Sequence, residues 1–300
     1  MKRSISLDQE QVLEGHTAAV RVVKFNRDGR YCMSGGYDKK IILWNPYQSK
    51  SICTYTGHSY QVLDLDITSD HLHFVSCGGD KQPFLWDVAA RLVIRKFRGH
   101  NSQINCVAFH PSASIFVTGS NDQTVKCWDC RSRSIDPIQV LPEARDSVTC
   151  VATSTIEIFT TSADGCLRTY DVRMGKLQTD CLACVISSVS LSNDGQILLL
   201  STLSNKLMLI DKEEGTLYHE YRGHTNTEFR VDSTFLNNSS FVASGSENGD
   251  ICVWALEDTE LLLKKKAHQK LLMGLAAHPY GKHLLTASED QTIKLWTLST

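Results

Sequence analysis

The stretch GHTAAVRVVKFNRDGRYCMSGGYDKKIILWN, residues 15–45, contains four markers at fixed spacing. A Gly-His pair ends in His16, Ser34 lies ten residues before Trp44, and Asp38 lies six residues before the same tryptophan. Between the markers, the apolar run VRVVKF is typical of a short β-strand, and Asp-Gly is typical of a turn. The stretch therefore predicts several short strands joined by turns.

The same stretch recurs along the chain. The five tryptophans end the apolar runs IILW, PFLW, VKCW, ICVW and IKLW, at intervals of 42, 42, 126 and 42 residues. The long interval is three periods, and Tyr170 in LRTYD and Ile210 in LMLID fill it with steps of 42, 40 and 44 residues. Seven units of about 40 to 45 residues are typical of the blades of a β-propeller. The tryptophans are Trp44, Trp86, Trp128, Trp254 and Trp296.

This ordered set of markers resembles the WD-repeat family over essentially all 300 residues. The resemblance implies that the histidine, hydroxyl residue, aspartate and tryptophan of a blade form a hydrogen-bonded chain across its strands. Burying an imidazole beside a carboxylate is tolerable only when both groups are paired, which supports that structural role. Besides the tryptophans, the predicted network consists of His16, His58, His100, His224, His268, Ser34, Ser76, Thr118, Thr286, Asp38, Asp80, Asp122, Asp164 and Asp290.

The two ends of the sequence are complementary. The chain stops four residues after Trp296, so the last unit lacks an outer strand, whereas residues 11–16 form an outer strand with no unit before it. We therefore predict an all-β, seven-bladed WD-repeat propeller that forms a single domain over residues 1–300. An outer strand at about residues 9–16 completes blade seven, and the third strands of the seven blades end near residues 44, 86, 128, 170, 210, 254 and 296. Closure of the ring leaves no exposed innermost edge.

Composition limits the classes of partner. Lys and Arg number 31 against 33 Asp and Glu, so a net charge of −2 gives no global field for nucleic acid or an acidic membrane. No uncharged apolar stretch approaches the ~18 residues of a membrane span. Three consecutive lysines at residues 264–266 are predicted to form a solvated strand end. Direct nucleic-acid or membrane binding is not expected.

The chemistry-bearing residues have structural explanations. The paired histidines and aspartates recur at the blade period, and the sequence has no G-x-S-x-G, H-E-x-x-H or phosphate-loop motif, so we expect no catalysis. The eleven cysteines are predicted to stay free in a reducing compartment, the cytosol or nucleus. The pairs Cys127-Cys130 and Cys181-Cys184 have C-x-x-C spacing, but 50 residues separate them and they fall in different blades. No metal or other cofactor is expected.

The irregular stretches VIRKFRGH, CWDCRSRS, EARDSV, SADGCLRTYDVRMGKL and GHTNTEFRVD are similar to the mitogen-activated protein kinase organizer family of WD-repeat proteins. That resemblance implies a non-catalytic scaffold. It would assemble components of the extracellular-signal-regulated kinase cascade and join spliceosomal protein complexes, in cytoplasm and nucleus. We expect a monomeric propeller within larger complexes.

A protein partner is predicted to bind around one mouth of the channel, where the loops entering the innermost strands and the aspartate turns meet. TNTEFRVD is the main candidate segment, because its unit has two more residues between histidine and tryptophan than the regular units. Phe229 either lies exposed near the channel or packs inward, and the sequence leaves both alternatives open. The predicted binding residues are Tyr37, Tyr60, Gln61, Gln103, Arg145, Asp146, Phe229 and Arg230.

A second functional class starts from two arginines. The segments ending in Arg131 and Arg173 fit W-D-x-R and its aromatic variant, a pattern similar to WD-repeat substrate receptors of cullin-RING ubiquitin ligases. In that interpretation both arginines would bind the adaptor of the ligase. In the other interpretation they pair with the neighbouring aspartates at the blade edge.

Overall fold

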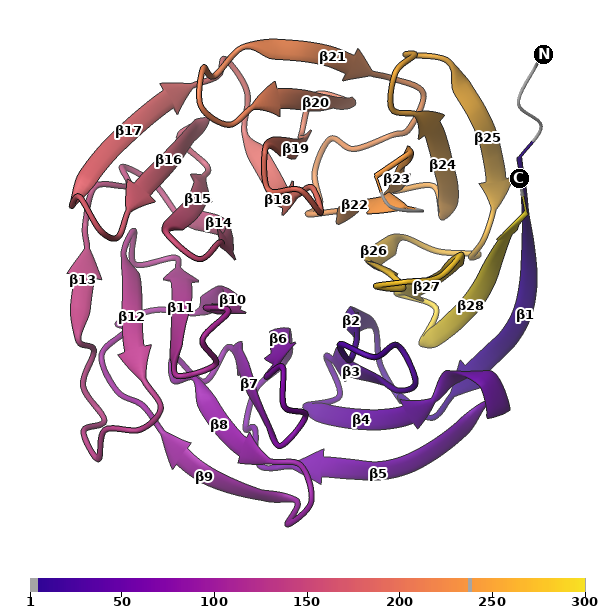
Figure 1. Ribbon diagram of the computed structural model, residues 1–300. Coiled ribbons are helices and arrows are strands. Elements are labelled where there is room, and N and C mark those ends of the chain that lie inside the picture. The colour runs from indigo at the N-terminus through magenta and orange to yellow at the C-terminus, as the bar shows by residue number, and fades with distance from the viewer. Residues whose placement is uncertain (1–4, 237–238, 300) are drawn as a thin grey trace.

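Seven four-stranded antiparallel sheets surround a central channel in the computed structural model, which describes residues 5–236 and 239–299 (Figure 1). Each sheet is one blade, and its strands follow one another from the channel outward. The predicted all-β, seven-bladed propeller is confirmed.

The strands are short because each unit is divided by turns. Those of blades one to four are β2 (Val20–Phe25), β3 (Cys32–Gly36), β4 (Lys40–Asn45), β5 (Lys50–Thr56), β6 (Val62–Ile67), β7 (His73–Gly78), β8 (Phe84–Asp87), β9 (Leu92–Lys96), β10 (Ile104–Phe109), β11 (Ile115–Ser120), β12 (Val125–Asp129), β13 (Gln139–Leu141), β14 (Val148–Thr153), β15 (Glu157–Ser162), β16 (Cys166–Asp171) and β17 (Lys176–Cys181). Those of blades five to seven are β18 (Ile186–Leu191), β19 (Ile197–Thr202), β20 (Lys206–Asp211), β21 (Leu217–Tyr221), β22 (Ser233–Leu236), β23 (Phe241–Gly245), β24 (Asp250–Ala255), β25 (Leu261–Lys266), β26 (Leu272–Ala277), β27 (His283–Ser288), β28 (Thr292–Ser299) and β1 (Ser6–Glu14).

Blade seven combines the two ends of the chain. Strand β1 pairs antiparallel with β28, and Figure 1 shows the indigo strand beside the yellow one. Strand β1 begins three residues earlier and ends two residues earlier than the predicted range of about 9–16. The earlier start has a packing reason, because Leu7 is paired with Leu298 and is only 1% exposed.

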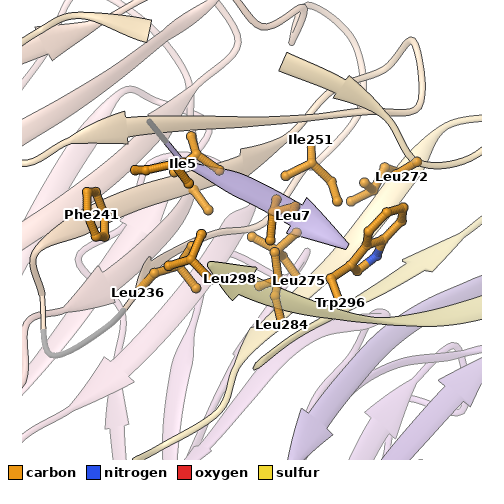
Figure 2. Packing of buried hydrophobic residues seen from close by; sticks show 13 residues of the cluster. Ile5, Leu7, Leu236, Phe241, Ile251, Leu272, Leu275, Leu284, Trp296 and Leu298 are labelled. Atoms are coloured by element: carbon orange, nitrogen blue, oxygen red, sulfur yellow. The ribbon is translucent and has the colours of Figure 1, made fainter. Parts of the chain in front are cut away.

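The apolar core lies between neighbouring blades. Figure 2 shows Ile5, Leu7 and Leu298 of the closing blade packed against residues of blade six such as Phe241. Because each blade buries both faces against its neighbours, closure by β1 protects an interface that would otherwise be open to water.

An aromatic side chain joins several blades to the next one. Tyr55, in the outer strand of blade one, packs 5.9 Å from the ring of Trp86 in blade two, and its hydroxyl donates to the Val88 carbonyl at 3.0 Å. Tyr221 packs in the same way on Trp254 and donates to the Leu256 carbonyl at 2.7 Å. These contacts fill the outer part of the interface between two blades.

The cysteines differ from the expectation in one place. Cys166 and Cys181 face each other across β16 and β17 and are joined by a disulfide bond, so the prediction that every thiol stays free is wrong for this pair. The remaining nine cysteines are free. Within residues 5–236 and 239–299, no group of three His, Cys, Asp or Glu side chains could hold a metal ion. No helix among them is long and apolar enough to cross a membrane.

Candidate functional site

Blades one, two, three and seven contain a hydrogen-bonded chain of four side chains. In blade three, Trp128 donates its indole N–H to Thr118 Oγ1 at 2.8 Å, Thr118 Oγ1 lies 2.8 Å from His100 Nε2, and His100 Nδ1 lies 2.8 Å from Asp122. The other three chains join His16, Ser34, Asp38 and Trp44; His58, Ser76, Asp80 and Trp86; and His268, Thr286, Asp290 and Trp296.

The order of groups in these chains is that of a Ser-His-Asp catalytic triad, but their environment is different. An indole N–H can only donate, so it occupies an acceptor site on the hydroxyl oxygen, and the hydroxyl can then donate to histidine Nε2. Ser34 is buried at 0% exposure beneath Trp44. A nucleophile needs access to its substrate, and this hydroxyl has none. The arrangement supports a structural role.

The network aspartates organise the loops as well as the histidines. Asp122 also accepts the backbone N–H groups of Asn101 and Thr124 at 2.9 and 3.1 Å. Although burial alone would raise the pKa of Asp122, the bonds from His100, Thr124 and Asn101 lower it below its ordinary value. Asp38, Asp80 and Asp290 have lowered pKa values for the same combination of causes. Their contribution to stability is therefore present above pH ~4 and is lost as the pH falls.

Blade four uses an arginine in place of the histidine. Arg168 donates to Asp164 at 2.7 Å and to Ser162 Oγ at 2.6 Å. Arg168 is not among the network residues predicted from the sequence. The signal was available, since it lies four residues after the network aspartate of a blade that lacks Gly-His.

The structure contradicts the predicted network in blade six. Neither ring nitrogen of His224 has a hydrogen-bond partner among the described residues, and Trp254 donates instead to the Arg222 carbonyl at 3.0 Å. Residue 248, six before Trp254, is asparagine and not aspartate, and its amide donates to Thr225 Oγ1 at 3.0 Å, so no carboxylate is offered to His224. The entry loop of blade six is also bonded to blade five. The side-chain amide of Asn226 donates to Ser201 at 2.9 Å, and the backbone N–H of Asn226 donates to Asn205.

The predicted binding residues can be located relative to this network. The contact of His16 with Asp38 brings an entry loop and an aspartate turn to the same end of a blade; we call this end of the propeller the channel-mouth face. Seven predicted residues lie in such loops and turns: Tyr37, Tyr60, Arg145, Asp146 and Phe229 are exposed, whereas Gln61 and Gln103 are partly buried and bond to each other at 3.2 Å.

Glu247 fixes the entry loop of blade six. Its carboxylate accepts the backbone N–H groups of Thr227, Glu228 and Phe229 at 2.7, 2.7 and 3.0 Å. Three donors on one carboxylate restrain the backbone of the loop, so a partner would meet a preorganised segment. Phe229 is 50% exposed in this loop, so it does not pack inward.

Arg230, the eighth residue, was wrongly assigned to the surface. Its guanidinium points into the channel and donates to the carbonyls of Asn105 and Thr149 in blades three and four, at 2.8 and 2.9 Å. Asp64 and Asp232 lie within 3.6 and 3.5 Å. These groups line a polar cavity of about 410 Å³, bounded by the innermost strands. A planar cation with several donors suits a site between carbonyls and carboxylates, so Arg230 links blades across the channel.

Arg131 and Arg173 lie at the opposite ends of the blades, because each follows a third strand whose first residues come after an aspartate turn. The side chain of Arg131 is 77% exposed and forms an ion pair with Asp129 at 3.8 Å, as the second interpretation of this arginine predicts. The carboxylate of Asp171 accepts the backbone N–H of Arg173 at 2.8 Å. Both guanidinium groups face solvent near the blade edge.

The fold and the repeated network define the class of WD40-repeat propellers. Residues 7–45, 49–87, 92–129, 215–255 and 259–297 match the family model described as WD domain, G-beta repeat. This repeat typically forms interaction scaffolds, and the match indicates no catalytic family. The longest unmatched interval, residues 130–214, contains blades four and five, in which both Gly-His and tryptophan are missing.

Curated relatives narrow the class further. The chain is 50% identical over 288 residues to rat WD repeat domain-containing protein 83, which covers 96% of this chain and 91% of the relative. It is 50% identical to the human protein of that name over 277 residues, which cover 92% of this chain and 88% of the human protein. It is 35% identical to a Dictyostelium discoideum homolog over 323 residues, which cover 98% of this chain and 99% of the homolog. The chain belongs to the WD repeat domain-containing protein 83 family.

Proposed function

We propose that this protein is a non-catalytic scaffold that assembles kinase-cascade components and spliceosomal proteins, in cytoplasm and nucleus. The resemblance to the mitogen-activated protein kinase organizer family supports the two processes. The WD40 propeller itself implies protein-protein interaction. The proposed binding surface is the channel-mouth face.

The observation that carries this proposal is that Phe229 is exposed on a restrained loop of the channel-mouth face. A half-exposed phenylalanine at a channel mouth is costly in water, and Glu247 restrains the backbone on which it lies. Aromatic residues are frequent anchors of protein interfaces, and a rigid backbone reduces the entropy lost on binding. Tyr37 and Tyr60 are exposed on the same face and extend the aromatic surface.

Phe229→Ala is expected to weaken binding of a channel-mouth partner about tenfold or more, since a buried aromatic anchor commonly contributes this much. The measurement is affinity purification of tagged protein from nuclear and cytoplasmic fractions, with quantitative mass spectrometry, followed by titration of each recovered protein. Tyr280→Ala is the matched control, because Tyr280 is an exposed aromatic in the loop between β26 and β27, away from the channel-mouth face. Unchanged affinity of every partner for the Phe229 variant would contradict the proposal.

The exposure of Arg131 favours a second candidate function, that of a substrate receptor of a cullin-RING ubiquitin ligase. Wild-type protein would then recover the ligase adaptor, and the double variant Arg131→Ala, Arg173→Ala would not. Failure of wild-type protein to recover the adaptor removes this candidate.

A further inference from the structure

The interface between blades three and four lacks the aromatic contact that fills other interfaces. In β5, Tyr55 pairs with Ile41, three residues before Trp44; in β21, Tyr221 pairs with Leu207, three residues before Ile210. In β13, the residue in the same register is Leu141, which pairs with Val125. The residue that it faces in the next blade is also smaller, because Tyr170 occupies the place of a tryptophan.

An apolar cavity of about 430 Å³ lies at this interface. Its inner wall consists of buried side chains, among them Val117, Leu141 and Ile158. Its mouth is flanked by exposed apolar side chains, Ile138 at 54% and Val172 at 56% exposure. The cavity is lined by residues of β13 and of the turn between β16 and β17, two segments that can be located in Figure 1. A mainly apolar cavity of this size is typical of a site for a buried side chain or small ligand.

The turn at the mouth carries two cations with no ion pair within the described part of the chain, Arg173 and Lys176. Two carboxylates, those of Asp171 and Glu143, line the same cavity. The carboxylate of Asp171 accepts the backbone N–H groups of Arg173 and Met174, and Glu143 accepts the hydroxyl of Tyr170 at 2.9 Å. The mouth therefore places two cations that have no ion pair among the described residues, together with two hydrogen-bonded carboxylates, beside apolar surface.

We propose that this cavity binds a tyrosine side chain of a partner protein, from a segment in which acidic residues flank the tyrosine. The tyrosine ring would occupy the place that Tyr55 and Tyr221 fill at other interfaces. Val172 lies two residues after Tyr170, as Val88 lies two residues after Trp86, so its carbonyl is positioned to accept the partner's hydroxyl. The flanking carboxylates would pair with Arg173 and Lys176. This site is separate from the channel-mouth face and does not depend on Phe229.

The probe for this site is the pentapeptide acetyl-Glu-Asp-Tyr-Asp-Glu-amide, titrated against the full chain at low ionic strength with fluorescence anisotropy of a labelled form. We expect saturable binding that is lost when alanine replaces the tyrosine and that weakens when lysines replace the acidic residues. Absence of saturable binding up to about 1 mM peptide would overturn the proposal.

Two variants locate the binding. Leu141→Tyr fills the cavity from within, so it is expected to raise the urea midpoint of unfolding and to weaken the peptide at least tenfold. Lys176→Glu leaves the core unchanged and is expected to weaken the peptide severalfold and to reduce the salt dependence of binding. Wild-type affinity in both variants would refute the site. Phe229→Ala should bind the peptide like wild type. Failure of the cavity proposal can therefore be distinguished from failure of the proposal for the channel-mouth face.

Discussion

Replacement of Asp122 by alanine is expected to lower the free energy of unfolding by about 3 to 5 kcal/mol, the largest effect that we predict for a polar side chain. The Asp122 side chain is 8% exposed and binds His100, Asn101 and Thr124. Its removal leaves the buried Nδ1 of His100 and the partly buried donors of Thr124 without this acceptor, and a buried unsatisfied donor costs ~1–3 kcal/mol. Equilibrium unfolding in urea, followed by tryptophan fluorescence, measures the change.

Asp136→Ala is the control for this experiment. Asp136 lies in the exposed loop between β12 and β13, and its replacement should change the free energy of unfolding by less than about 0.5 kcal/mol. If Asp122→Ala were as mild as this control, the hydrogen-bonded chain would not be a main source of blade stability.

Lowering the pH from 7 to 4 is expected to remove about 3 kcal/mol of stability through His224 alone. Burial lowers the pKa of His224 to about 4, the Lys264 ammonium adds to this lowering, and the Glu247 carboxylate opposes it. The folded protein therefore binds the proton less tightly than the unfolded chain does, whose histidine titrates near pH 6.5. The contribution is fully present above pH ~6.5 and is lost as the pH falls toward 4.

The variant His224→Leu tests this expectation. Leucine keeps the apolar contact with Trp254 and removes two ring nitrogens that have no partner among the described residues. At pH 7 the variant should be as stable as wild type or more stable, and its urea midpoint should fall less between pH 7 and 4. Burial also lowers the pKa of His100, so some pH dependence remains in both proteins. Parallel curves for the two proteins would show that His224 does not titrate in this range.

The regular blades could be predicted because their markers are local. His16, Ser34, Asp38 and Trp44 fall within 29 residues, so their spacing alone brings them together once the turns form. Blade six could not be predicted in the same way. His224 lies two residues further from its tryptophan than the other marker histidines do, residue 248 is asparagine, and neither ring nitrogen of His224 has a partner among the described residues.

Arg230 is a further case. In the sequence it follows Phe229 in an exposed loop, and nothing local distinguishes the two side chains. In the structure they diverge: Phe229 lies in a bend and is exposed, whereas Arg230 follows the bend and turns into the channel. The acceptors of Arg230 are the carbonyls of Asn105 and Thr149, which are 125 and 81 residues away in the chain.

The sequence by itself determined the number of blades, the closure by the N-terminal strand and the repeated network, since these depend on a period and on contacts within one unit. Only the tertiary structure decided which side chains are free to bind a partner. The packing of neighbouring blades joins residues from different units. It decides that Phe229 is exposed, that Arg230 points into the channel and that a cavity lies in front of Leu141. A periodic sequence specifies the structure that the units share. The candidate binding surfaces lie where a unit departs from the period and the neighbouring blade packs against it differently.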